Sequence, residues 1–194
     1  MLYDNQYIEI RHKKGLIRIN RLVNQNDNDY NKLYQIAEYF ADKGSVVELA
    51  PKMSRSSNFE YESLYYDLIG TKYEGKCPDL RIDGLWYEHE GFVTDNPKTA
   101  FRNMLNHGLK QSSRIIINRP NLTDAFMKRI IKQRVKDGHD IDEVWIMDDN
   151  SIIPLYKKSE EWYFTPPSGN ESVVISYGIV IAKILQFLIL SRWK

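Results

Sequence analysis

Apolar and polar residues alternate in two stretches of the chain, and this pattern predicts two β-hairpins. Residues 7–22 alternate around Lys14-Gly15. A second alternating stretch is centred on Asp83-Gly84, a dipeptide favoured in two-residue hairpin turns. Short apolar runs rich in β-branched residues predict four further strands, at residues 45–51, 114–118, 142–147 and 151–156.

Apolar residues recur every three or four positions in three other stretches, which predicts helices. The first helix lies within residues 24–44, with Asp27 or Asn28 as its N-cap and Gly44 as its stop. The other two cover residues 98–112, opened by Asn96-Pro97, and residues 122–138, capped by Thr123; a shorter helix is possible within residues 58–70. Strands that pair as a hairpin in the middle and alternate with helices afterwards predict an α/β domain with a mixed sheet flanked by helices.

The composition is that of a globular protein. The chain has 194 residues, of which 42% are hydrophobic and 27% charged, so we expect one domain with a real core. The formal charge of +1 argues against a protein that coats nucleic acid over its whole surface. The single cysteine, Cys77, excludes an internal disulfide framework and a multi-cysteine zinc site. Because the first residues also lack the layout of a signal peptide, we expect a cytoplasmic protein.

The C-terminal part of the chain has a different pattern. We expect the main domain to cover residues 1–157, a linker to cover residues 158–172 and an apolar segment to cover residues 173–194. Residues 173–190 are about as long as a minimal membrane span, but Lys183 stands in their middle. A membrane anchor and a helix packed against protein are both compatible with this pattern, and we favour the packed helix.

The predicted hairpin at Asp83-Gly84 brings carboxylates together. With a two-residue turn, Asp79 lies opposite Glu88, and Glu90 points to the same face. Like charges placed opposite each other destabilise a strand pair unless something offsets them. A divalent ion such as Mg²⁺ would do so, since it binds through one or two carboxylates plus water. The alternative is a solvated face with a salt bridge between Arg81 and Glu88.

Other polar residues are expected near this hairpin. Glu48 lies on a strand that can pair beside it, and Arg102, Asn106 and Lys110 share one stripe of the helix predicted at residues 98–112. A metal ion polarises a phosphate and activates water, and a nearby cation stabilises the negative charge that develops during hydrolysis. These residue types therefore suit cleavage of a phosphodiester. A solvated helix face is the alternative for Arg102 and Lys110.

The motif Cys-Pro-Asp at residues 77–79, followed nine positions after the aspartate by Glu88, resembles the PD-(D/E)XK nuclease motif. Residues 28–157 more narrowly resemble the C-terminal tRNase domains of contact-dependent growth-inhibition (CdiA-type) toxins. The matching landmarks are a helix ending in Gly44 and, after it, VVELAP, PDLRIDG, WYEHEGF, LKQSSRIIIN and IDEVWIM. The resemblance implies a restriction-endonuclease-like fold, metal-dependent cleavage of nucleic acid, typically tRNA, and a cognate immunity protein that covers the site.

The resemblance also implies roles for particular residues. Asp79 and Glu88 match the metal-binding acids, and Glu48 is the best candidate for a further acid, with Glu60 and Glu62 as rivals. Glu90 is the alternative to Glu48 as the acid that assists catalysis. Because Glu90 stands where the motif has a lysine, we expect Lys110 to supply that charge. We expect the substrate to be contacted by Arg81, Arg102, Asn106 and Gln111. If no lysine reaches the site, the protein is instead a catalytically inactive member that binds nucleic acid or a partner protein.

Two histidines near the motif are expected to be structural. His89 falls on the apolar face of the hairpin by alternation, which predicts a packed side chain. His107 is a lone histidine on a predicted helix, a position that is usually structural or exposed to solvent.

Overall fold

A computed structural model describes residues 6–53, 58–91, 96–148 and 151–158. The chain divides into two units, residues 1–158 and 159–194, and all described residues belong to the first. The predicted linker, apart from Lys158, and the apolar segment therefore lie outside the described residues. Across the four described ranges, no helix is both long and apolar enough to cross a membrane.

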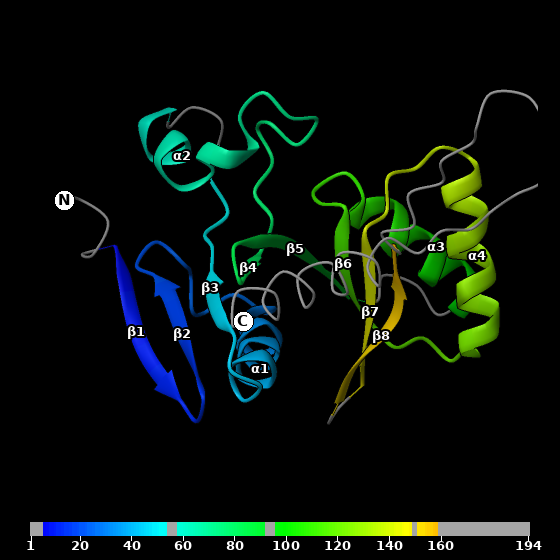
Figure 1. Ribbon diagram of the computed structural model, residues 1–194, viewed down its shortest axis with the longest axis horizontal. Helices are drawn as coiled ribbons and strands as arrows, with labels where there is room; N and C mark the ends of the chain where they lie inside the picture. Colours follow the sequence, from blue (N-terminus) through cyan, green and yellow to red (C-terminus); the bar gives the residue numbers. More distant parts are fainter. Residues whose placement is uncertain (1–5, 54–57, 92–95, 149–150, 159–194) are drawn as a thin grey trace, which may run out of the picture. The chain divides into compact units, whose positions relative to one another are not determined.

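Within the described ranges, the strands form one mixed sheet of eight strands whose spatial order equals their order in the chain (Figure 1). Neighbouring strands are antiparallel except β2–β3, β5–β6 and β6–β7, which are parallel. The strands are β1 (Tyr7–His12), β2 (Gly15–Asn20), β3 (Val46–Leu49), β4 (Leu80–Ile82), β5 (Leu85–Glu90), β6 (Arg114–Asn118), β7 (Glu143–Asp148) and β8 (Ser151–Lys157). The predicted α/β class with a mixed sheet is thus confirmed.

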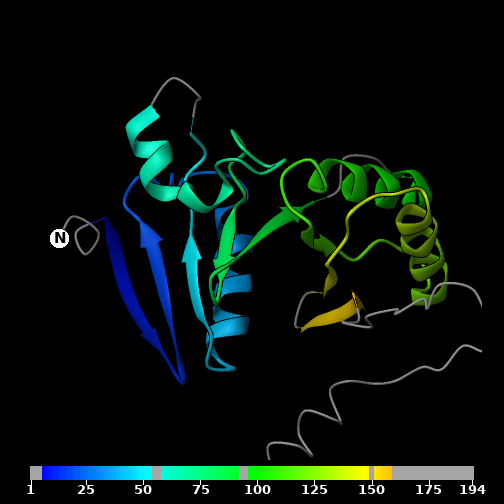
Figure 2. The same cartoon turned by 45° about the horizontal axis from the view of Figure 1, so that its top comes forward.

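Helices cover both faces of this sheet, as Figure 2 shows. The helices are α1 (Tyr30–Ala41), α2 (Asn58–Leu64), a 3₁₀ turn η1 (Tyr66–Leu68), α3 (Pro97–Gly108) and α4 (Asp124–Lys136). On one face α1 packs on residues such as Ile17, Val47 and Ile82. On the other face, α3 and α4 pack on Ile115 of β6 and Val144 of β7. A third cluster joins α2 and η1 to the hairpin strand β5.

The expected element boundaries in the N-terminal part of the chain need two corrections. The first hairpin turns at Lys13 and Lys14, not around Lys14-Gly15, because His12 pairs directly with Gly15. Helix α1 has Asp29 as its N-cap, without a side-chain capping bond, in place of the expected Asp27 or Asn28. Two successive turns occupy residues 24–30 through backbone hydrogen bonds, so the first helical bond starts only from the carbonyl of Asp29.

The two later helices begin where the sequence predicts. The Asn96 side chain accepts hydrogen bonds from the backbone of Lys98 and Thr99, and Pro97 occupies the first turn of α3. The Thr123 side chain caps α4 by accepting from the backbone of Phe126.

Candidate active site

The β4–β5 hairpin has the register that the sequence predicts. Ile82 pairs with Leu85 and Leu80 pairs with Tyr87. Asp83 and Gly84 have φ values of 48° and 83°, the positive values that a type I′ turn requires at both central positions. This turn fixes which side chains of β4 and β5 share a face, and it directs Asp79 and Glu88 to the same side.

Three carboxyl groups are buried together at the open end of this hairpin. Asp79, Glu88 and Glu90 are 6%, 8% and 7% exposed, so the alternative of a solvated carboxylate face is wrong. The backbone N–H of His89 donates to Asp79 Oδ2 over 3.1 Å, and the backbone N–H of Asp79 donates to the Glu88 carboxylate. Glu88 Oε2 is buried without a hydrogen-bond partner in the described part of the chain.

Burial and mutual repulsion make these groups hard to ionise. Burial raises the pKa of Asp79, and the hydrogen bond from His89 opposes that rise. Burial, followed by the charges of Asp79 and Glu90, raises the pKa of Glu88 well above its ordinary value. Such a pair is stable when it shares a proton or when a cation lies beside it.

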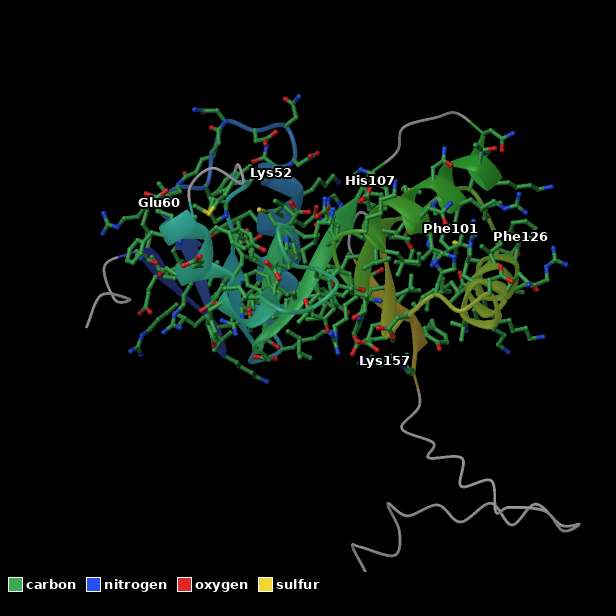
Figure 3. The ribbon with its side chains drawn as sticks, turned by 90° about the horizontal axis from the view of Figure 1, so that it is seen from above. Lys52, Glu60, Phe101, His107, Phe126 and Lys157 are labelled. Carbon is green, nitrogen blue, oxygen red and sulfur yellow. The ribbon has the colours of Figure 1, made fainter. Side chains whose placement is uncertain are left out.

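The cation that acts on this pair is Lys52, which follows the end of β3 (Figure 3). Its positive charge lowers the pKa values of both Asp79 and Glu88. The side chain is largely exposed, with its Nζ 3.8 Å from a carboxylate oxygen of Asp27 and of Asp29. The backbone just before Lys52 is held in place because the buried Tyr65 hydroxyl donates to the carbonyl of Pro51 over 2.7 Å.

Glu90 has a different partner, His107 of α3. His107 Nδ1 lies 2.5 Å from Glu90 Oε1, and the imidazole is otherwise exposed. Gly108 allows this approach, because a Cβ at that position would lie 2.9 Å from Ile115 Cγ2 and 3.2 Å from Glu90 Cγ. The expectation that His107 is exposed is therefore correct but incomplete, since it also pairs with the acid at the lysine position of the motif.

Lys110 is not part of the helical stripe that the sequence predicts. Helix α3 ends at Gly108, and the backbone N–H groups of Lys110 and Gln111 instead close tight turns onto His107 and Gly108. Lys110 is exposed and forms no ion pair with a described residue. The positive charges that lower the pKa values of the three carboxyls come from Lys52 for Asp79 and Glu88, from His89 for Asp79 and from His107 for Glu90.

The other residues predicted on this stripe differ in their surroundings. Arg102 is exposed on α3. Asn106 and Gln111 are half-buried, and each has a buried side-chain oxygen without a partner among the described residues.

Glu48 lies on the same face of the sheet as the carboxyl pair but makes other contacts. Its Oε1 accepts from Arg18 Nη1 over 3.3 Å, and its Oε2 is 3.8 Å from Arg81 Nη1. Arg81 pairs with Asp67 at 2.8 Å, so the salt bridge from Arg81 to Glu88, which belonged to the alternative interpretation, does not form. The rival acids Glu60 and Glu62 are exposed on α2.

His89, the other histidine near the motif, is packed, as the alternation of side chains along β5 predicts. His89 is 8% exposed, and its Nε2 lies 3.0 Å from Asn118 Oδ1 on the neighbouring strand β6. Its backbone N–H also donates a hydrogen bond to the carboxylate of Asp79 in the site.

The chemistry of the donor atoms suits a hard divalent cation. Two carboxylates and water are the ligand set with which proteins hold Mg²⁺, and the bare Oε2 of Glu88 offers a buried ligand atom. Taken over the described ranges, no group of three or more His, Cys, Asp or Glu side chains is arranged to hold a metal. An ion at Asp79 and Glu88 would therefore depend on water for most of its ligands.

Sequence reasoning missed Lys52 and the partnership of His107 with Glu90. A signal for Lys52 was present, because it follows directly after the strand predicted to lie beside the hairpin. Comparisons of the chain with protein-family models, with curated proteins and with solved structures find no match.

Proposed function

We propose that this protein is a metal-dependent nuclease that hydrolyses phosphodiester bonds, as the resemblance to PD-(D/E)XK nucleases implies. The observation that carries the proposal is the buried pair Asp79 and Glu88, with a bare carboxylate oxygen and with the positive charge of Lys52 acting on both groups. Burying two carboxylates costs free energy, and cation binding by the pair would offset that cost. The mixed sheet, with this hairpin at its centre and helices on both faces, is compatible with a restriction-endonuclease-like core.

Each residue has a definite chemical task in this proposal. Asp79 and Glu88 would hold Mg²⁺, which when bound polarises the phosphate and lowers the pKa of water. Lys52 would stabilise negative charge on the phosphoryl oxygens, the task first expected of Lys110. Glu90 accepts from His107 Nδ1, which leaves Nε2 as the imidazole atom that can take or give a proton.

The resemblance favours RNA, and tRNA in particular, as the substrate. The same resemblance supports a cognate immunity protein as a partner that would cover the carboxyl pair. Both belong to the proposal and can be tested separately from cleavage itself.

One observation favours the second candidate, a catalytically inactive protein that binds nucleic acid or a partner protein. Glu90 occupies the lysine position of the motif and is paired with His107, so that position offers an acid in place of a cation. In this case the buried carboxyls would be protonated and structural.

A cleavage assay separates the two candidates. The purified full chain is incubated with total tRNA or plasmid DNA, in Mg²⁺ or in EDTA, beside an Asp79→Asn variant and an exposed control, Glu62→Gln. The nuclease proposal expects cleavage only in Mg²⁺, its loss in Asp79→Asn and its retention in the control. Cleavage that survives both EDTA and Asp79→Asn would refute the proposed site. Binding of nucleic acid without cleavage in any condition would support the second candidate.

A further inference from the structure

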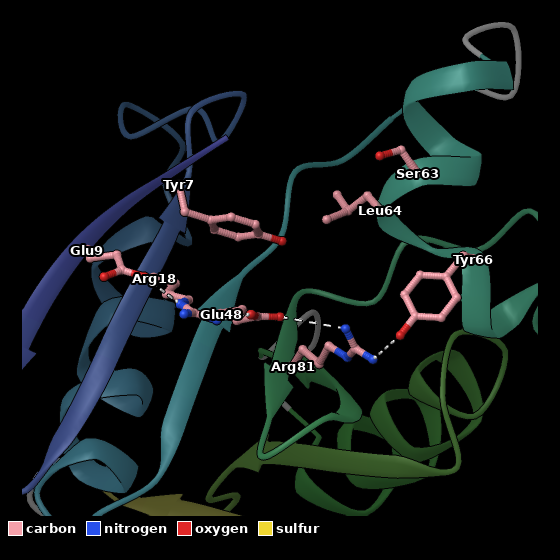
Figure 4. A pocket seen from close by; sticks show the side chains of 8 residues that line it. All are labelled: Tyr7, Glu9, Arg18, Glu48, Ser63, Leu64, Tyr66 and Arg81. Carbon is pink, nitrogen blue, oxygen red and sulfur yellow. Dashed lines mark hydrogen bonds and ion pairs between the residues drawn. The ribbon is translucent and has the colours of Figure 1, made fainter. Parts of the chain in front are cut away.

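A pocket of about 110 Å³, open to solvent, has Glu48 and Arg81 among its lining residues (Figure 4). Its polar floor comes from β1 to β4 and its other wall from α2 and η1. It is lined by Tyr7, Glu9, Arg18, Glu48, Ser63, Leu64, Tyr66 and Arg81. Two arginines and two glutamates cancel in formal charge, so the pocket does not have the positive excess that favours a free phosphate.

The polar groups on the floor form a row with alternating hydrogen-bonding character. Glu48 lies between Arg18 and Arg81, so an acceptor is flanked by a donor on each side. Both contacts of Glu48 are long, at 3.3 Å and 3.8 Å, which leaves its oxygens able to accept further hydrogen bonds.

The two guanidinium groups are held in place by other acids. Arg18 Nε donates to Glu9 over 2.8 Å, and Arg81 Nη2 donates to Asp67 over 2.8 Å. The Nη1 atom of each arginine faces Glu48, from β2 for Arg18 and from β4 for Arg81. The row is therefore positioned in advance and would not need to be assembled around a ligand.

Aromatic groups beside the row offer flat surfaces. The Tyr7 ring extends from β1 across the pocket, and Tyr66 faces Arg81 from η1, as Figure 4 shows. The Arg81 guanidinium lies 5.6 Å from the Tyr66 ring centre and 5.4 Å from that of Trp86. Tyr66 is more than half exposed, so its ring is open to stacking by a flat molecule.

We infer that this pocket binds a guanine base of the nucleic acid strand, an inference that rests on the proposed nuclease function. Guanine is planar and presents acceptors at O6 and N7 next to donors at N1–H and N2–H. Arginine matches the acceptors and a glutamate carboxylate matches the donors. Adenine and cytosine each lack the pair of adjacent donors that Glu48 would accept.

The position of the pocket connects it with the carboxyl pair. Glu48 pairs with Arg81 across β3 and β4, and the next row on the same face contains Ala50, whose N–H donates to the carbonyl of Asp79. Two residues of strand separate the rows, about 6.6 Å at about 3.3 Å per residue. A nucleotide with its base in the pocket would therefore bring its own phosphates next to Asp79.

The inference is tested with nucleosides, which have no phosphate and cannot be cleaved. Isothermal titration with guanosine, adenosine, cytidine, uridine and inorganic phosphate should show guanosine binding at least about tenfold more tightly than the other nucleosides. Glu48→Gln should weaken guanosine binding about tenfold or more, because an amide cannot accept from both donors with two oxygens. Glu62→Gln, exposed on α2, should leave it unchanged. Circular dichroism checks that the variants are folded.

Three outcomes would overturn the inference, each in a different way. Equal affinity for all four nucleosides would indicate unselective stacking. Phosphate binding that strengthens in Glu48→Gln would indicate an anion site, since the substitution leaves both arginines with one fewer negative neighbour. No binding of any probe would indicate an ionic network only. Guanosine binding without cleavage of any nucleic acid would keep the inference and refute the nuclease proposal.

Discussion

Replacing Glu88 by glutamine should stabilise the metal-free protein at neutral pH. Side chains opposite each other on antiparallel strands have Cβ atoms about 5 Å apart. Two unit charges at about 5 Å repel by about 3 kcal/mol at an effective dielectric constant of about 20. Because Lys52 offsets part of this repulsion, we expect a gain of about 1–3 kcal/mol in the free energy of unfolding. The corresponding rise in Tm is roughly 3–10 °C.

The pH dependence of this gain follows from the raised pKa of Glu88. Well below its ordinary pKa of 4.5 the carboxyl is protonated in both folded and unfolded states, and the substitution should change little. As the pH rises towards the folded pKa, the unfolded state ionises freely while the folded state resists, so the wild-type protein loses stability. The advantage of Glu88→Gln should therefore grow with pH and level off above the folded pKa.

Thermal unfolding in EDTA between pH 4 and pH 9 measures this effect, with Glu62→Gln as the exposed control. Adding Mg²⁺ should raise the Tm of the wild-type protein and leave Glu88→Gln almost unchanged, since ligand binding stabilises only a folded state that can bind. A Glu88→Gln variant that is less stable than the wild type at every pH in EDTA would refute the reasoning about buried repulsion.

Three further predictions concern residues around the carboxyl pair. Lys52→Ala should reduce nucleic-acid cleavage at least about tenfold while Lys110→Ala should not, and equal loss in both would contradict the assignment of the cation. Gly108→Ala should lower the free energy of unfolding by about 1–3 kcal/mol in urea denaturation, because the new Cβ would lie 2.9 Å from Ile115. Tyr65→Phe should cost about 1 kcal/mol by removing a buried hydrogen bond, and should weaken cleavage as well if the bond positions Lys52.

The elements with strong local signals could be predicted from the sequence. The Asp83-Gly84 dipeptide determines the turn type, and the turn determines the register that sets Asp79 opposite Glu88. The caps at Asn96 and Thr123 were equally local, because each side chain bonds to backbone two or three residues away. Such features depend on a few neighbouring residues and do not require knowledge of the tertiary structure.

The sequence predictions were wrong where tertiary contacts determine the structure. Helical periodicity continues from Arg102 to Lys110, but packing of Gly108 against β6 accompanies the end of the helix two residues earlier. The burial of the carboxyl pair could not be predicted either, because charged residues are exposed by default and the cover on this face comes from helices whose packing is a tertiary property. Lys52, whose charge acts on the pair, stands at a loop position that has no periodic signal.

The identity of spatial and chain order in the sheet has a consequence for how the protein folds. Every strand pairs with its immediate predecessor, so no strand has to enter between two that are already paired. As the chain leaves the ribosome, the sheet could grow outwards from β1, each crossover helix adding the next parallel strand. Helix α1 does not follow this local order, because it packs against residues that are synthesised much later, Trp145 on β7 and Ile152 on β8. Synthesis of the last strand would therefore complete a core that the first helix began.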